Sequence, residues 1–255
     1  MKKILLCFLV IGVLFSSCNR SAEETSSSPQ TTETESSAAS SDNLKEIGGE
    51  SYFLTESTEN DIVSVEVPFF EGKEIVNKAV YSYILKTLKD LTAEDFDLKT
   101  TEKDIEEKEY KDYYIDISYR IALNSENLIS IIFEGFLNYK TAAHPNHLFF
   151  TLNLNPKTGE KIYFSKEAKI DENLFNIFIG KATENFSEKE ASIKVEQVFD
   201  KETFLTGLQR EYEIESGFYC YYTEEAVGIS YPVPFALGNH IEIEIPKDSV
   251  VWEKR

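Results

Sequence analysis

Alternation of hydrophobic and polar residues predicts most of the strands in this chain. The clearest case is residues 113–123, where one face carries only Ile115, Ile117, Tyr119, Ile121 and Leu123. The other face carries Asp116, Ser118 and Arg120, so we expect it to be solvated. The same period of two predicts strands over residues 63–70, 147–155, 218–222, 228–231 and 240–246. Residues 128–139 are apolar on both faces and should form a central strand, and residues 161–164 should pair back after a turn.

A helical period separates some of these strands. Val76, Val80, Ile84 and Leu88 follow one another at four-residue steps, which predicts a helix with one buried face over residues 76–91. Further helices are expected over residues 174–186 and 201–212. Because consecutive strands joined by short turns pair antiparallel, we expect an α+β fold, with a mainly antiparallel sheet and helices packed on one face. Residues 46–150 and 151–255 are predicted to form the N-terminal and C-terminal halves of the folded domain.

The N-terminus has the pattern of a bacterial lipoprotein. Lys2 and Lys3 precede an apolar run, residues 4–15, which is shorter than the roughly 20 residues that span a bilayer. We therefore expect a signal peptide over residues 1–17. Phe15, Ser16 and Ser17 before Cys18 resemble the bacterial lipobox, which implies that Cys18 becomes the mature N-terminus and carries lipid. A plain signal peptide followed by an incidental cysteine is the alternative.

The segment after Cys18 is predicted to be a tether. It is rich in Ser, Thr and Glu, and residues 21–41 contain no aromatic or β-branched aliphatic side chain. Such a stretch cannot bury enough apolar area to offset the entropy of ordering it. We expect residues 18–45 to be a disordered tether that holds the folded domain away from the membrane.

The strongly negative net charge limits the classes of molecule that we expect the chain to bind. The net charge is −19, and removal of residues 1–17 takes away two lysines and no acid, which leaves about −21. Nucleic acids and anionic lipid surfaces require a basic face, so we expect neither to bind directly. An acidic surface attracts basic proteins at long range. Solubility alone is the simpler explanation of the same charge.

Candidate chemistry is sparse. His144 and His147 could ligate zinc with His240 or a carboxylate as a third ligand, but we favour a structural role for them and expect no metal and no cofactor. We find no Ser-His-Asp order, glycine-rich phosphate loop or Cys-x-x-Cys pair, so we expect no enzyme. Cys220 is predicted to be a buried, inert thiol. The tyrosines at 219, 221, 222 and 231 could line a surface groove or fill the core.

Three stretches of the folded part occur together in one known family. They are residues 65–72 before a helix that contains Asn77, residues 143–146 (Ala-His-Pro-Asn) before the Asn-Pro-Lys-Thr-Gly-Glu turn at 155–160, and the closing strands with Tyr231-Pro-Val-Pro. They resemble the RsiV-like and PdaC-like bacterial envelope domains, one of which is the ectodomain of a lysozyme-sensing anti-sigma factor. The resemblance covers nearly all of residues 50–250. It implies a domain without enzymatic activity.

These observations favour a lipid-anchored, non-catalytic binding module of the bacterial cell envelope. Its ligand is expected to be a basic protein such as lysozyme, or a cell-wall glycan such as peptidoglycan. The candidate binding residues are His144, Pro145, Asn146, His147, Tyr219, Tyr221 and Tyr231. The alternatives are a metal-dependent hydrolase of wall components that uses His144 and His147, and a purely structural lipoprotein.

Overall fold

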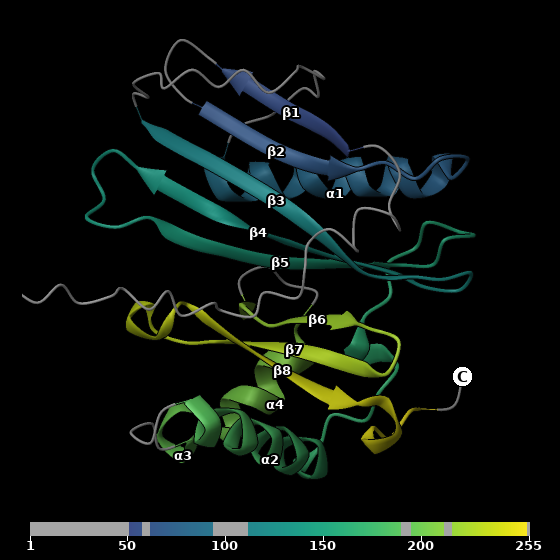
Figure 1. Cartoon of the computed structure of the whole chain (residues 1–255), viewed down its shortest axis with the longest axis vertical. Coiled ribbons are helices and arrows are strands. Elements are labelled where there is room, and N and C mark those ends of the chain that lie inside the picture. Colours follow the sequence, from purple (N-terminus) through teal and green to yellow (C-terminus); the bar gives the residue numbers. More distant parts are fainter. Residues whose placement is uncertain (1–50, 58–61, 94–111, 190–194, 212–215, 254–255) are drawn as a thin grey trace, which may run out of the picture. The chain divides into compact units, whose positions relative to one another are not determined.

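The computed structural model describes residues 51–57, 62–93, 112–189, 195–211 and 216–253 (Figure 1). Their strands form two sheets, with the order β1-β2-β3-β4-β5 in one and β6-β7-β8 in the other. The first sheet consists of β1 (Ser51–Ser57), β2 (Ile62–Pro68), β3 (Tyr113–Asn124), β4 (Ile129–Tyr139) and β5 (Asn146–Leu154). The second consists of β6 (Tyr219–Tyr222), β7 (Ala226–Pro232) and β8 (His240–Pro246). The predicted α+β class is confirmed.

Helix α1 (Glu74–Thr92) lies against one face of the five-stranded sheet (Figure 1). It connects β2 to β3 by a crossover, so these two strands pair in parallel, while the other neighbours in both sheets pair antiparallel. The buried stripe of α1 is the predicted one, and it packs on Ile115, Ile131 and Phe133 of the sheet. The β2–α1 turn is held by the side chain of Asn77, which accepts from the backbone N–H of Phe70 and donates to its carbonyl.

A bulge changes the end of β3. The register with β4 shifts between Ile121 and Leu123, so the strict alternation predicted for residues 113–123 stops there. Ile121 is buried in the core beneath α1, whereas Leu123 packs against the core of the second sheet. The prediction that Leu123 shares a face with Ile121 is therefore wrong.

Helices α2 (Glu172–Lys189), α3 (Val195–Val198) and α4 (Lys201–Gln209) accompany the second sheet (Figure 1). Their shared core is aromatic: the Phe178 ring lies 4.8 Å from Phe204 and 5.1 Å from Phe199, centroid to centroid. Asp200 caps α4 by accepting from the backbone N–H of Thr203 at 2.7 Å. The strand expected over residues 161–164 is reduced to one bridge between Leu154 and Lys161, and a 3-10 turn follows at Phe164–Lys166. Sequence patterns did not predict β1 or α3.

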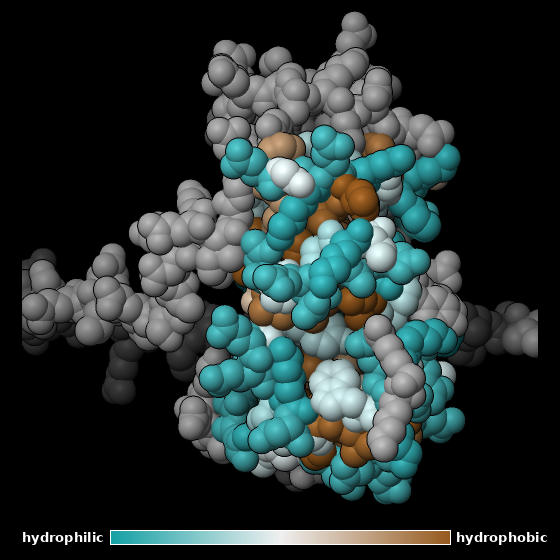
Figure 2. Space-filling model, turned by 90° about the vertical axis from the view of Figure 1, so that its right-hand side faces the viewer, coloured by the Kyte–Doolittle hydropathy of each residue, from teal (hydrophilic) through white to brown (hydrophobic). Residues whose placement is uncertain are grey.

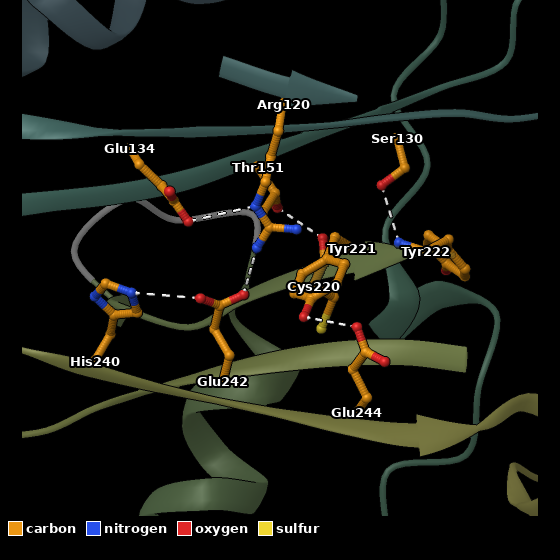
Figure 3. A network of polar contacts seen from close by, with 10 residues as sticks. All are labelled: Arg120, Ser130, Glu134, Thr151, Cys220, Tyr221, Tyr222, His240, Glu242 and Glu244. Carbon is orange, nitrogen blue, oxygen red and sulfur yellow. Dashed lines mark hydrogen bonds and ion pairs between the residues drawn. The ribbon is translucent and has the colours of Figure 1, made fainter. Parts of the chain in front are cut away.

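The free edge of β6 rests on polar side chains of the first sheet (Figure 3). The Cys220 carbonyl accepts from Thr151 Oγ1 at 2.6 Å, as Figure 3 shows. It also accepts from Asn153 Nδ2 at 2.8 Å. The Tyr222 N–H donates to Ser130 Oγ at 2.9 Å, and that hydroxyl donates to Asn153 Oδ1 at 2.7 Å. Side chains thus satisfy edge groups that would otherwise lack partners or pair with another chain.

Exposed hydrophobic side chains are scattered over the surface. On the face shown in Figure 2, hydrophobic residues (brown) show between hydrophilic ones (teal) in several areas. The large hydrophobic side chains that the described residues expose are Ile75, Phe136, Leu237, Val251 and Trp252. Single exposed hydrophobic residues are normal in folded proteins, so they do not mark a binding surface by themselves. The grooves and the clusters of polar side chains are therefore the candidate sites.

Candidate functional site

An ion-pair cluster centred on Arg120 joins the two sheets (Figure 3). Arg120 of β3 places Nη2 2.7 Å from Glu242 Oε2 on β8 and Nε 3.5 Å from Glu134 Oε1 on β4. Burial disfavours the charged guanidinium and so lowers the pKa of Arg120, but the two carboxylates have the opposite effect, and overall the pKa is raised. Burial raises the pKa of Glu242, yet the neighbouring His240 and the Arg120 charge lower it overall. Arg120 is only partly exposed, so this face of β3 is less solvated at this position than the alternation predicts.

Tyr221 of β6 extends the cluster. Its hydroxyl donates to Glu244 Oε1 at 3.2 Å, and the Arg120 guanidinium carbon lies 5.2 Å from the ring centroid. The ring occupies the space beside Gly228, where an added Cβ would come within 2.0 Å of Tyr221 Cζ. Only glycine at position 228 leaves room for this placement.

His240 connects the cluster to a neighbouring groove. Its ring centroid lies 4.3 Å from that of Phe149, and Nε2 lies 3.8 Å from Glu242 Oε1. The other ring nitrogen points away from Glu242 in Figure 3; it is buried and has no hydrogen-bond partner among the described residues. His240 is therefore oriented by Glu242 while Nδ1 remains available for a further contact.

The groove beside His240, here called the His240 groove, has a volume of about 260 Å³. Its lining comes from α1, β5, β6, β7 and β8 and from Gly217 and Asn239, and is mostly apolar. Ser230 lines it with a fully buried hydroxyl that lacks a partner in the described part of the chain. Tyr219 lines it too, and burial raises the pKa of its hydroxyl to about 12, which keeps that hydroxyl protonated at neutral pH. Apolar walls with a few polar groups are typical of small-ligand sites.

The structure brings only part of the predicted binding set to this groove. His147 lies on β5, exposed, with its ring 4.5 Å from Phe136, and it lines the groove together with Tyr219. His144 and Pro145 lie in the loop before β5, and Asn146 begins that strand opposite Leu137. These three residues are not part of the groove lining.

The other candidate tyrosines lie in the interior, the alternative that the sequence left open. Tyr221 is buried between the sheets, and Tyr222 and Tyr231 belong to the core of the second sheet. The Tyr231 hydroxyl accepts from the backbone N–H of Asp200 at 3.1 Å and so supports the start of α4. The packing of Tyr231 is that of a core residue.

A second depression is acidic. Glu224 and Glu225 in the β6–β7 turn and Glu244 of β8 are exposed around a shallow hollow of about 460 Å³, which Lys181 also borders. We call this surface the acidic depression. Its carboxylates are suited to contact with the basic side chains of a partner.

A third, smaller cavity of about 60 Å³ holds a buried acid. Glu211 is 8% exposed; Oε1 accepts from the Ser165 N–H at 2.8 Å, while Oε2 has no partner among the described residues. Burial raises the pKa of Glu211, although the Cys220 thiol donates to it and opposes the shift. Cys220 is buried and free, as predicted, and burial raises its pKa well above the usual value.

Some of the predicted features lie outside the described residues. Cys18 and the tether lie outside them. Within the described ranges, no group of three or more His, Cys, Asp or Glu side chains is placed to hold a metal ion. The zinc hypothesis for His144 and His147 stays a prediction. No helix in the described part is long and apolar enough to cross a bilayer.

Sequence patterns missed Arg120, Ser230, Glu242 and Glu211. The signal for Arg120 was present, since one guanidinium stands in an otherwise regular alternating strand, but its partner Glu242 lies 122 residues away. Nothing in the local sequence indicated that Ser230 and Glu211 would be buried without full pairing.

Comparison with known proteins gives structural neighbours only. No protein-family model matches the sequence, and no curated protein is similar to it. A DUF3298 family protein from Bacteroides fragilis has a similar structure, with 14% identity, a TM-score of 0.48, and coverage of 82% of this chain and 95% of that chain. A DUF3298 family protein from Pseudomonas aeruginosa has 12% identity, a TM-score of 0.45, and coverage of 79% and 94%.

Proposed function

We propose that this chain is a non-catalytic binding module of the bacterial cell envelope, tethered to a membrane by lipid on Cys18, which binds a basic protein such as a lysozyme-like hydrolase. The observation that carries the proposal is the net charge of −19, combined with the exposed carboxylates of the acidic depression. A surface of one sign raises the rate at which an oppositely charged partner arrives.

The sequence supports the location and the absence of catalysis. The Lys2-Lys3 start, the apolar run and the residues before Cys18 fit a lipoprotein signal. Two or more acyl chains on one cysteine give a lasting anchor, since each buried CH₂ contributes about 0.8 kcal/mol. The proposal of no enzyme rests on the lack of catalytic motifs in the sequence.

Binding to immobilised hen lysozyme tests the proposal. The full-length chain in detergent should bind with a Kd of about 1 μM or lower at low ionic strength and should weaken steeply as salt shortens the Debye length to about 8 Å. Binding that is absent at low salt, or unchanged by salt, would remove the basic protein as the ligand. Retention on insoluble peptidoglycan in place of lysozyme would assign a glycan ligand instead.

A pair of charge-reversed variants locates the contact. Glu224→Lys with Glu225→Lys changes the acidic depression, whereas Glu71→Lys with Glu126→Lys makes the same charge change at exposed positions elsewhere. We expect the first variant to weaken lysozyme binding at least tenfold more than the second. Equal weakening by both would show that net charge alone is responsible and would remove the depression as the site.

A further inference from the structure

Three residues that line the His240 groove have a buried polar atom without a hydrogen-bond partner among the described residues: Thr87 Oγ1, Ser230 Oγ and His240 Nδ1. Leaving a buried donor or acceptor unsatisfied costs about 1–3 kcal/mol, so such atoms in a native structure need an explanation. Thr87 lies on α1, and Ser230 and His240 come from the adjacent strands β7 and β8. A ligand that enters the groove and pairs with them would remove this cost.

The aromatic wall gives the groove its second property. Phe149, Tyr219 and His240 line it, with the Phe149 centroid 4.3 Å from His240 and 6.1 Å from Tyr219. Ring faces of this kind suit a flat or puckered group with an apolar C–H face. The volume of about 260 Å³ lies just below the roughly 300–1,000 Å³ of sites for drug-sized molecules. The groove therefore fits one ring, which can belong to a longer chain.

The uncharged lining of the His240 groove disfavours ionic ligands. Among the described residues, the side chains that line the groove include no Asp, Glu, Lys or Arg. A charged group placed there would lose its hydration without gaining a counter-ion. With the imidazole proton on Nε2, toward Glu242, Nδ1 accepts a hydrogen bond, while the Ser230 hydroxyl both donates and accepts. The matching ligand is neutral and carries both donors and acceptors beside an apolar face.

We infer that the His240 groove binds an uncharged sugar residue of a glycan chain. A pyranose ring combines an apolar C–H face, which stacks on Phe149 and Tyr219, with hydroxyl groups that reach Ser230 Oγ and His240 Nδ1. This site lies apart from the acidic depression and goes beyond the proposed binding of a basic protein.

Titration with N,N′,N″-triacetylchitotriose, a neutral trisaccharide, tests the inference by calorimetry on the full-length chain in detergent. We expect a Kd of about 0.1–1 mM, within the range of weak ligands, that does not change with salt because the ligand carries no charge. The inference of sugar binding and the proposal of lysozyme binding can therefore be refuted independently, because the first predicts binding that does not change with salt and the second predicts binding that weakens with salt. No saturation with the trisaccharide at about 10 mM, near the weak end of measurable affinities, would overturn the inference.

Ser230→Ala gives the sharpest readout. Since the hydroxyl has no partner among the described residues, its removal should leave the stability unchanged or raise it, yet weaken trisaccharide binding about fivefold to tenfold. Ser64→Ala is the matched control: Ser64 is also buried, with a hydroxyl that has no partner in the described ranges, but it does not line the groove, so binding should be unchanged. Equal binding by the two variants would refute the role of Ser230.

Aromatic substitutions separate stacking from general packing. Tyr219→Phe keeps the ring and should bind within about twofold of the natural chain, whereas Tyr219→Leu should lose binding about tenfold, consistent with the energy of one aromatic contact. Thermal unfolding would verify that both variants fold. Tight binding of a proline-rich decapeptide, lost in Tyr219→Leu, would assign the groove to a peptide and reject the sugar.

Discussion

Replacing Ser130 with alanine tests how the edge of β6 is held. The Ser130 hydroxyl is fully buried, accepts from the Tyr222 N–H at 2.9 Å and donates to Asn153 Oδ1 at 2.7 Å. Its removal leaves one donor and one acceptor without a partner in the contact between the two sheets. Each buried unsatisfied group costs about 1–3 kcal/mol, so Ser130→Ala should lower the free energy of unfolding by about 2–6 kcal/mol.

Urea denaturation followed by circular dichroism measures this change. The midpoint should fall while the slope with urea stays the same, since the surface exposed on unfolding is unaltered. Ser118→Ala is the control, because that hydroxyl is exposed and makes only a 3.4 Å contact with the Glu134 carbonyl, and it should cost less than about 0.5 kcal/mol.

The same set of hydrogen bonds predicts coupling. Ser130 and Asn153 are joined directly, and Asn153 also donates to the Cys220 carbonyl, so the double variant Ser130→Ala with Asn153→Ala should deviate from additivity by about 0.5–3 kcal/mol. A loss below about 0.5 kcal/mol for Ser130→Ala, at an unchanged slope, would refute the view that these side chains replace a strand at the edge of β6.

Three further predictions concern single positions. Burial raises the pKa of Glu211 in the folded chain, so its contribution to stability is full below the unfolded pKa of about 4.3 and is lost as pH rises through the folded pKa. Glu211→Gln should therefore stabilise the chain more at pH about 8 than at pH about 4. An equal effect of the substitution at both pH values, measured by urea denaturation, would contradict this. Gly228→Ala should displace the Tyr221 ring and cost about 1–3 kcal/mol, with a changed near-ultraviolet circular dichroism spectrum; an unchanged spectrum would count against it. Phe178→Ala should cost about 3–5 kcal/mol in thermal or urea unfolding, and the exposed Phe136→Ala less than about 1 kcal/mol; similar losses would be inconsistent with the core.

Local patterns predicted the regular elements well where one face is buried. The stripe from Val76 to Leu88 and the alternation at β3 and β8 are confirmed, because burial on one side imposes a period of 3.6 or 2 on the residues themselves. Buried Cys220 was predicted because free cysteines in strand-like apolar runs are usually buried. The alternation at β3 failed at Leu123, where a bulge that leaves no mark in the local pattern changes the face.

The candidate sites depended on contacts between distant segments. Arg120 meets Glu242 across 122 residues, and the His240 groove needs α1, β5 and the second sheet together. His147 and Tyr219 were predicted as single candidates, but their place in one groove was not. Hydrophobic periodicity carries no information about which polar side chains will meet.

The sequence by itself therefore determined the fold class, the main strands and helices, and the acidic charge, since each follows from the identity of neighbouring residues. Tertiary structure decided that the strands divide into two sheets and that Ser130, Thr151 and Asn153 hold the edge of β6. It also decided that Ser230 and His240, in one groove, each keep a buried atom without a partner in the described part of the chain. The physical reason is that hydrogen bonding and desolvation depend on which atoms are close in space, and that depends on the packing of the whole chain.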